Sequence, residues 1–151
     1  MTFSELEARI SALEDIKAIK SMHKEFVYLL MNSQLEEMLD YFADNAVVEM
    51  RSSGPCKGKE EITKLLKHEI TDLNNPTNIY MLVQPVINAS GDTAKGHWIM
   101  DYFTKDPNTP SGPSPIYMPG RHDCEYTRIN GEWKFSYLNW TCPWPEHAVK
   151  Q

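Results

Sequence analysis

Apolar side chains recur every three or four positions over the N-terminal part of the chain, which is the spacing of one face of an α-helix. This pattern predicts a long amphipathic helix from Phe3 to Leu30. Two shorter segments with the same spacing, Leu35 to Phe42 and Lys59 to Ile70, predict further helices. The first half of the chain is therefore expected to be mainly helical, with a short strand from Ala46 to Met50.

The second half has the alternation and the turn residues of β-strands. Long strands are predicted over Thr77 to Ala89 and Thr93 to Thr104, with a bulge at Pro85 because proline cannot donate a ladder hydrogen bond. Residues 105–120 are rich in proline, so no regular structure is expected there. Loops of this length are uncommon unless they act as lids or interaction arms, and both a lid and a plain surface excursion stay open.

The dipeptide Asn130-Gly131 predicts a final β-hairpin, because a type I′ turn needs positive φ at both central residues. A two-residue turn sets the register of the flanking strands. The expected pairs are Ile129 with Glu132, Arg128 with Trp133, Tyr126 with Phe135, Cys124 with Tyr137 and His122 with Asn139. One face of the hairpin is therefore expected to be aromatic and to end in His122.

Composition and charge narrow the class of protein and its partners. The chain has 151 residues, 41% hydrophobic and 24% charged, which suits one domain with its own core. Its net charge is -6 and the basic residues form no run, so nucleic acid is not expected as a partner. No apolar run approaches the roughly 20 residues of a membrane span, and no signal peptide is indicated. We expect a cytoplasmic protein with reduced cysteines.

Three segments carry a resemblance to known proteins. They are Ile16 to Leu30, residues 41–47 (Tyr-Phe-Ala-Asp-Asn-Ala-Val) with Gly-Lys-Glu-Glu-Ile at 58–62, and residues 125–135 around the Asn-Gly turn. They resemble the nuclear transport factor 2-like superfamily, in particular its SnoaL-like branch with scytalone dehydratase and the bile acid 7α-dehydratases. The resemblance covers nearly the whole chain, so residues 1–151 are expected to form a single SnoaL-like domain.

This resemblance implies the fold class α+β, as a cone-shaped α+β barrel in which a curved mixed sheet wraps around a long N-terminal helix. It also implies a deep, mostly apolar pocket, and members are commonly dimers. We expect a homodimer that buries the outer sheet face, including Ile99 and Phe103, because apolar residues on the second face of a sheet need cover.

The resemblance also indicates where acid-base groups would stand. In the dehydratase-like members a Tyr and an Asp of the long helix act with a His and an Asp of the central strands. Alignment places Phe26 and Met31 at the helix positions, Tyr80 at the His and Tyr102 at the strand Asp. These acid-base groups are thus replaced, while the pocket wall is retained. The inward wall positions are Tyr80, Trp98, Met100 and Tyr102.

His122 is the candidate catalytic residue, because the hairpin register and the resemblance both place it inside. An unperturbed imidazole has a pKa near ~6.5 and can accept or donate a proton at neutral pH. We expect His122 to abstract a proton next to a carbonyl of a small, cyclic, largely apolar substrate, with Tyr80 and Tyr102 stabilising the oxyanion, as in a lyase or isomerase. The other expected ligand-binding residues are Phe26, Tyr28, Met31, Trp98, Met100, Cys124, Tyr137 and Asn139.

The alternative is a non-catalytic ligand-binding or assembly domain, in which His122 only satisfies Asn139. No cofactor is expected. No metal site is expected either, since the remaining histidines His23, His68 and His147 show no ligand spacing with each other or with the cysteines.

His97 and Asp101 are spaced like a catalytic dyad, but four residues along a strand separate two positions by roughly 13 Å. They also fall on the face opposite Trp98. An outer-face or dimer-interface role is favoured for both residues.

Overall fold

The computed structural model describes residues 1–50, 53–72, 78–106 and 114–143. Within these ranges the helices are α1 (Phe3–Met31), α2 (Leu35–Leu39) and α3 (Gly58–Asp72). The strands are β1 (Phe42–Met50), β2 (Cys56–Lys57), β3 (Ile79–Ser90), β4 (Thr93–Asp106), β5 (Ser114–Met118), β6 (Arg121–Ile129) and β7 (Glu132–Thr141). The long helix, the two short helices and the long strands are confirmed, with bounds that differ by a few residues.

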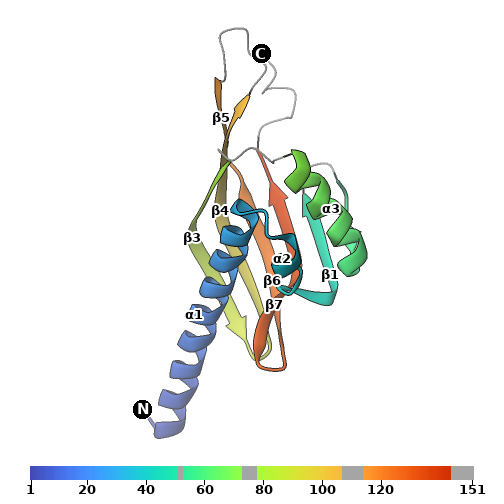
Figure 1. Ribbon diagram of the computed structural model, residues 1–151. Helices are drawn as coiled ribbons and strands as arrows, with labels where there is room; N and C mark the ends of the chain where they lie inside the picture. The colour runs from blue at the N-terminus through green and yellow to red at the C-terminus, as the bar shows by residue number, and fades with distance from the viewer. Residues whose placement is uncertain (51–52, 73–77, 107–113, 144–151) are drawn as a thin grey trace.

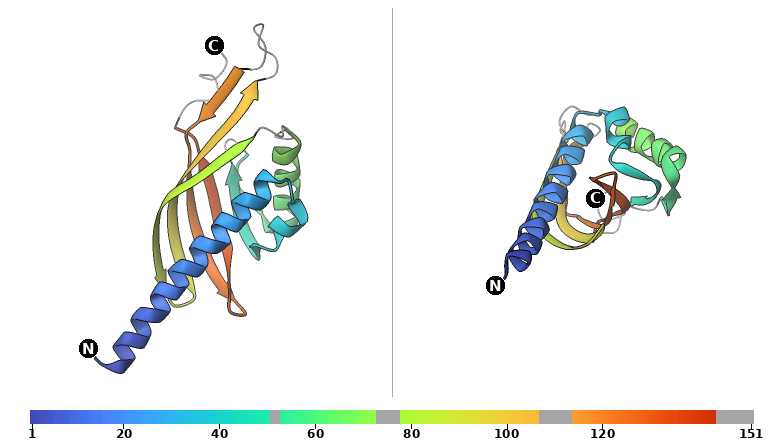
Figure 2. Two further views of the ribbon diagram at one scale, coloured as in Figure 1. Left: turned by 60° about the vertical axis from the view of Figure 1, so that its left-hand side comes forward. Right: turned by 90° about the horizontal axis from the view of Figure 1, so that it is seen from below.

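The strands form one mixed sheet in the order β2-β1-β7-β6-β4-β3, with β5 paired to β4. All neighbours are antiparallel except β1 and β7, which are parallel. The sheet curls around α1, which crosses its concave face, while α3 packs against β1 (Figures 1 and 2). The expected α+β fold with a curved mixed sheet around the N-terminal helix is therefore confirmed.

Helix α1 begins at a capping box, in which Thr2 and Glu5 satisfy each other's backbone N–H groups. Its buried face starts only at Ile19 and continues to Leu30. The N-terminal turns extend beyond the sheet (Figure 2), so that Leu6 and Leu13 are exposed although they belong to the apolar spacing that predicted the helix. No helix in the described part of the chain is long and apolar enough to span a membrane.

The bulge predicted at Pro85 is confirmed. The register of β3 against β4 shifts between Val83 and Val86, and Gln84 has a φ of 52°. The prediction for residues 105–120 is partly wrong, because β5 forms within this span and Tyr117 pairs with Phe103 of β4. An edge strand tolerates proline because one of its sides has no ladder to complete. Residues 107–113, the rest of the predicted lid, lie outside the described residues.

The turn at Asn130-Gly131 is confirmed, with φ values of 52° and 83°. The predicted pairs hold from Ile129 with Glu132 to Tyr126 with Phe135. Beyond them the register is wrong by one residue, because a bulge follows Phe135 and adds one residue to β7. The observed pairs are Glu125 with Tyr137, Cys124 with Leu138, Asp123 with Asn139 and His122 with Trp140.

Asp15 ties the long helix to the turn end of this hairpin. Its carboxylate accepts hydrogen bonds from the Arg128 guanidinium (2.5 Å) and the Trp133 indole (3.2 Å). Arg128 lies 4.9 Å from the centre of the Trp133 ring, so these paired residues also form a cation-π contact. One carboxylate therefore fixes the angle at which α1 enters the cone.

Candidate functional site

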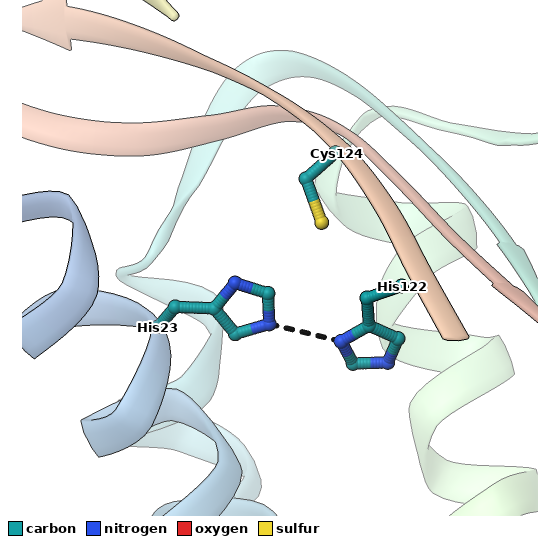
Figure 3. A group of neighbouring side chains, drawn as sticks. All are labelled: His23, His122 and Cys124. Carbon is teal, nitrogen blue, oxygen red and sulfur yellow. Dashed lines mark hydrogen bonds between the residues drawn. The ribbon is translucent and has the colours of Figure 1, made fainter. Parts of the chain in front are cut away.

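A hydrogen-bonded pair of histidines lies on the inner face of the sheet. Nε2 of His23, from the middle of α1, is 2.9 Å from Nδ1 of His122 on β6. Both side chains are almost completely buried, and their rings lie 5.1 Å apart at an interplanar angle of 20°. Figure 3 shows the helix presenting His23 to His122, with Cys124 of the same strand pointing toward the pair. Residues distant in sequence thus share one buried polar cluster.

Tyr126 and Trp98 complete the cluster behind His23. The Tyr126 hydroxyl is 2.8 Å from Nδ1 of His23 and accepts a hydrogen bond of 3.0 Å from the Trp98 indole. Tyr126 is also hydrogen-bonded to the Cys124 thiol. Gly96 of β4 makes room for this arrangement, because a Cβ there would lie 2.9 Å from the Tyr126 hydroxyl oxygen. The glycine and the strand geometry therefore hold Tyr126 against His23.

Burial keeps every titratable group of the cluster uncharged. It lowers the pKa of His122 to about 3, and together with the neighbouring His122 it holds the pKa of His23 well below the usual range. Burial likewise raises the pKa of the Cys124 thiol and of the Tyr126 phenol. At neutral pH the cluster therefore consists of two neutral imidazoles, a thiol and a phenol.

The proton positions in the cluster follow from the donors available. Trp98 can only donate, so the Tyr126 oxygen is an acceptor. If Tyr126 donates to Cys124, His23 donates from Nδ1 to Tyr126, and His122 donates from Nδ1 to His23. Nε2 of His122 then carries a lone pair. If Tyr126 donates to Nδ1 of His23 instead, both imidazoles take the other tautomer. Nε2 of His23 then donates to Nδ1 of His122, and Nε2 of His122 carries a proton. The same ring can thus present an acceptor or a donor at Nε2.

Tyr80 and Tyr102 form a second inward pair, with ring centres 5.1 Å apart across β3 and β4. Tyr102 lies four residues along β4 from Trp98, the strand partner of His122, a spacing of roughly 13 Å along the backbone. Met100 lies between them on the same face and is buried. The structure therefore places the two tyrosines inside, one layer of side chains away from His122.

Of the other predicted site residues, some are buried inside the sheet and some are exposed. Phe26, Trp98 and Cys124 are buried on the inside, as expected. Tyr28 and Met31 are 64% and 39% exposed at the C-terminal end of α1, so the structure does not bring them to the histidines.

Tyr137 and Asn139 also lie apart from the cluster, because the bulge in β7 turns them to the outer face. Tyr137 donates to Glu49 there, and Asn139 pairs with Asp123. The expectation that His122 pairs with Asn139 is therefore wrong, and its partner is His23.

Comparison with known proteins agrees with this architecture. The family model of the SnoaL-like domain matches residues 11–139. The chain belongs to the SnoaL-like domain family. No curated protein sequence matches it.

Solved structures share the fold of this SnoaL-like domain at low sequence identity. An NTF2-like protein with a cystatin-like fold from Novosphingobium aromaticivorans is 14% identical, with a TM-score of 0.79 over 99% of this chain and 95% of that chain. The hexachlorocyclohexane dehydrochlorinase LinA-type3 from Novosphingobium barchaimii LL02 is 20% identical, with a TM-score of 0.75 over 90% of this chain and 91% of that chain. At these identities the likeness concerns the fold.

Sequence reasoning missed His23 as a member of the site in this SnoaL-like domain. It was considered only for metal-ligand spacing, and none was found. A usable signal was present, because His23 lies four residues after Ile19 and three before Phe26, on the buried face of the helix. A polar residue on such a face needs a buried partner, and the fold supplies His122 and Tyr126.

The outer sheet face of the SnoaL-like domain carries a separate polar group. Nδ1 of His97 lies 2.6 Å from Asp123, which also accepts a hydrogen bond from Arg121. Asp101 instead accepts hydrogen bonds from Tyr117 and from the backbone of Gly120. The expectation that His97 and Asp101 face outward and do not form a dyad is confirmed, and the carboxylate beside His97 is that of Asp123.

Proposed function

We propose that this SnoaL-like domain binds a small, cyclic, largely apolar molecule and moves a proton at the carbon next to a carbonyl group, as a lyase or isomerase does. The observation that supports this function is the buried pair of His23 and His122. His23 orients the His122 ring through Nδ1. Among the hydrogen bonds of the described residues none involves Nε2 of His122, and this is the nitrogen that the proposal assigns to the substrate.

In the proposed step Nε2 of His122 takes the proton from the substrate carbon, and the electrons of the broken bond move to the carbonyl oxygen. The products of the step are an imidazolium and an enolate. Burial disfavours either charge alone, but the two form next to each other and together carry no net charge. The imidazolium then returns the proton to another substrate atom or to the leaving group.

The phenols of Tyr80 and Tyr102 are proposed to donate hydrogen bonds to the oxyanion. Because Met100 lies between these phenols and His122, one ligand that contacts both has to extend past this side chain. A fused or multi-ring scaffold satisfies that requirement better than a single ring. A named neighbour of the same fold, hexachlorocyclohexane dehydrochlorinase, also has a cyclic apolar molecule in its name.

The function is tested with a panel of single-ring and fused-ring ketones in deuterated water, by following deuterium entry next to the carbonyl with mass spectrometry. The wild-type protein is expected to accelerate exchange of a fused-ring ketone. His122→Asn should lower that rate by about 100-fold, the scale of a lost general base. His68→Gln is the matched control, because His68 is exposed on α3, away from the cluster and from the outer face of β3 and β4, and its replacement should leave the rate unchanged. If the His122→Asn variant still exchanges deuterium at the wild-type rate, His122 is not the catalytic base.

A non-catalytic binding or assembly domain is the second candidate. It is favoured by the side chains at the positions where the family resemblance expects acid-base groups, since Phe26 is buried and apolar and Met31 is largely exposed. The cytoplasmic location proposed for either function agrees with the free thiols of Cys56, Cys124 and Cys142.

We further propose a homodimer formed through the outer face of β3 and β4. This face exposes an apolar stripe over adjacent strand positions, formed by Ile79, Met81, Val83, Val86 and Ile99. Exposed apolar patches of this kind mark interaction surfaces. Light scattering should give twice the 17.4 kDa chain mass for the wild type and the monomer mass for Val83→Lys. A wild-type monomer at micromolar concentration would contradict the dimer.

A further inference from the structure

The buried cluster offers ligands for a metal ion. One atom from each of His23, His122 and Cys124 lies within 4.8 Å of the others. Figure 3 shows the two imidazoles and the thiol converging on one space from α1 and β6. Two imidazole nitrogens and a thiolate sulfur are a ligand set that selects soft, thiophilic ions.

The separations are close to those of a bound site. Ligands at about 2.0–2.1 Å for nitrogen and about 2.3 Å for sulfur stand roughly 3.3–3.7 Å apart around a tetrahedral ion. The imidazole nitrogens are now 2.9 Å apart. To bind an ion, the two imidazole nitrogens therefore have to move slightly apart. The Cys124 sulfur has to move closer to them.

The surroundings orient one of the ligands, His23, as outer partners do in known metal sites. A ligating histidine donates its other N–H group to a fixed acceptor, which sets its tautomer. The Tyr126 oxygen is 2.8 Å from Nδ1 of His23 and is held by the Trp98 indole. With Nδ1 protonated, the lone pair of His23 is on Nε2 and points toward His122 and Cys124.

The charge of the ion is limited by the apolar surroundings. Aromatic rings of Trp98, Phe135 and Phe26 lie 4.8, 4.9 and 6.5 Å from the His23 ring. A monovalent ion with one thiolate and two neutral imidazoles carries no net charge, whereas a divalent ion would leave one uncompensated positive charge in this environment. Among thiophilic ions this favours Cu⁺ over Zn²⁺.

We propose that His23, His122 and Cys124 form a binding site for Cu⁺. Binding releases the Cys124 thiol proton to solvent. Two bonds from the imidazole nitrogens to the ion replace the hydrogen bond between the two rings. The remaining proton of His122 is then on Nε2. No electron is transferred. The inference does not depend on the proposed proton transfer. Metal binding is measured without a ketone, and ketone exchange is measured on chelator-treated protein, so either idea can fail while the other holds.

The test is anaerobic competition with bicinchoninate, a coloured Cu⁺ chelator, after refolding the full chain from urea with Cu⁺ because the cluster is buried. One Cu⁺ per chain is expected for the wild type and for the matched control in which Cys56 and Cys142 are both replaced by serine. Cys124→Ser should weaken binding by at least about 100-fold, beyond the loss typical of outer partners. Retention of Cu⁺ by Cys124→Ser, or no Cu⁺ held by the wild type, overturns the proposal.

X-ray absorption of the copper-loaded wild type provides a measurement that does not depend on the folding of a variant. One sulfur and two imidazole nitrogens are expected around the ion, and a first shell without sulfur contradicts the site. A parallel competition with Zn²⁺ and a coloured Zn²⁺ chelator tests the charge argument. Binding of Zn²⁺ without binding of Cu⁺ would overturn the assignment of a monovalent ion.

Discussion

Mild acid should destabilise this protein because His23 and His122 are buried in their neutral forms. Burial lowers the pKa of His122 to about 3 and holds the pKa of His23 well below the usual range. In the unfolded chain both imidazoles return to a pKa near ~6.5. Below that pH the unfolded state binds more protons than the folded state, so the free energy of unfolding falls as pH falls. Above it the contribution of the pair to stability is complete.

The size of the effect follows from the two pKa values. At pH 5 an unfolded histidine is 1.5 units below its pKa, and each unit corresponds to about 1.4 kcal/mol, so one buried histidine costs about 2 kcal/mol. His122 alone should therefore lose about 2 kcal/mol between pH 8 and pH 5, which is a large part of the ~5–15 kcal/mol of a typical domain. His23 adds to this loss in the same direction, because burial and the neighbouring His122 hold its pKa well below the usual range.

Urea unfolding followed by tryptophan fluorescence at several pH values from 8 to 5 measures this loss. A chelator keeps the cluster free of metal, and ionic strength is held constant. This window lies mostly above the carboxylate range, so acidic side chains contribute little. His122→Gln should remove about 2 kcal/mol of the pH dependence, because the buried imidazole of His122 is gone. His97→Gln, which changes an exposed histidine, should leave the contribution of the buried pair in place.

The outcome that refutes the reasoning is a free energy of unfolding that stays constant within about 1 kcal/mol from pH 8 to pH 5. It would mean that the folded state accommodates the protons, and hence that the histidine pair is hydrated or charged. A pH dependence that persists unchanged in His122→Gln would show that it does not come from His122.

Two substitutions test the packing around the cluster. Gly96→Ala should cost about 1–3 kcal/mol by overpacking, because the new Cβ would meet the Tyr126 ring at 2.8 Å, and urea unfolding measures this loss. Unchanged stability would show that Tyr126 is free to move. Asp15→Ala should also cost about 1–3 kcal/mol, because it leaves the hydrogen-bonding groups of Arg128 and Trp133 without this acceptor. Its control is Glu14→Ala on an exposed position, and equal losses in both variants would contradict the anchoring role.

The local pattern of the sequence was enough to predict most elements of the fold. Apolar spacing located the long helix, alternation located β3 and β4, and Pro85 and Asn130-Gly131 located a bulge and a turn. These features depend on backbone preferences of a few consecutive residues. The resemblance to the SnoaL-like family, whose model matches residues 11–139, was carried by Ile16 to Leu30, residues 41–47 with 58–62, and residues 125–135 around the Asn-Gly turn.

Features that depend on how strands and helices meet could not be predicted in this way. The bulge after Phe135 has no proline or glycine to announce it, yet it turns Tyr137 and Asn139 to the outer face. Strand β5 forms in a proline-rich segment because the edge of β4 is available to it. The spacing in the N-terminal turns of α1 predicted a buried face, but the sheet ends before it can cover Leu6 and Leu13.

The candidate site shows the same division. The sequence alone identified His122 as an inward histidine, from the alternation of one strand and the family resemblance. Its partner His23 lies 99 residues away in the chain, and only the packing of α1 into the concave sheet brings their nitrogens to 2.9 Å. The imidazoles of His23 and His122 and the thiol of Cys124 stay uncharged because the fold removes water from around all three groups at once. Desolvation of this kind depends on the complete fold, because no single segment can exclude water from its own side chains.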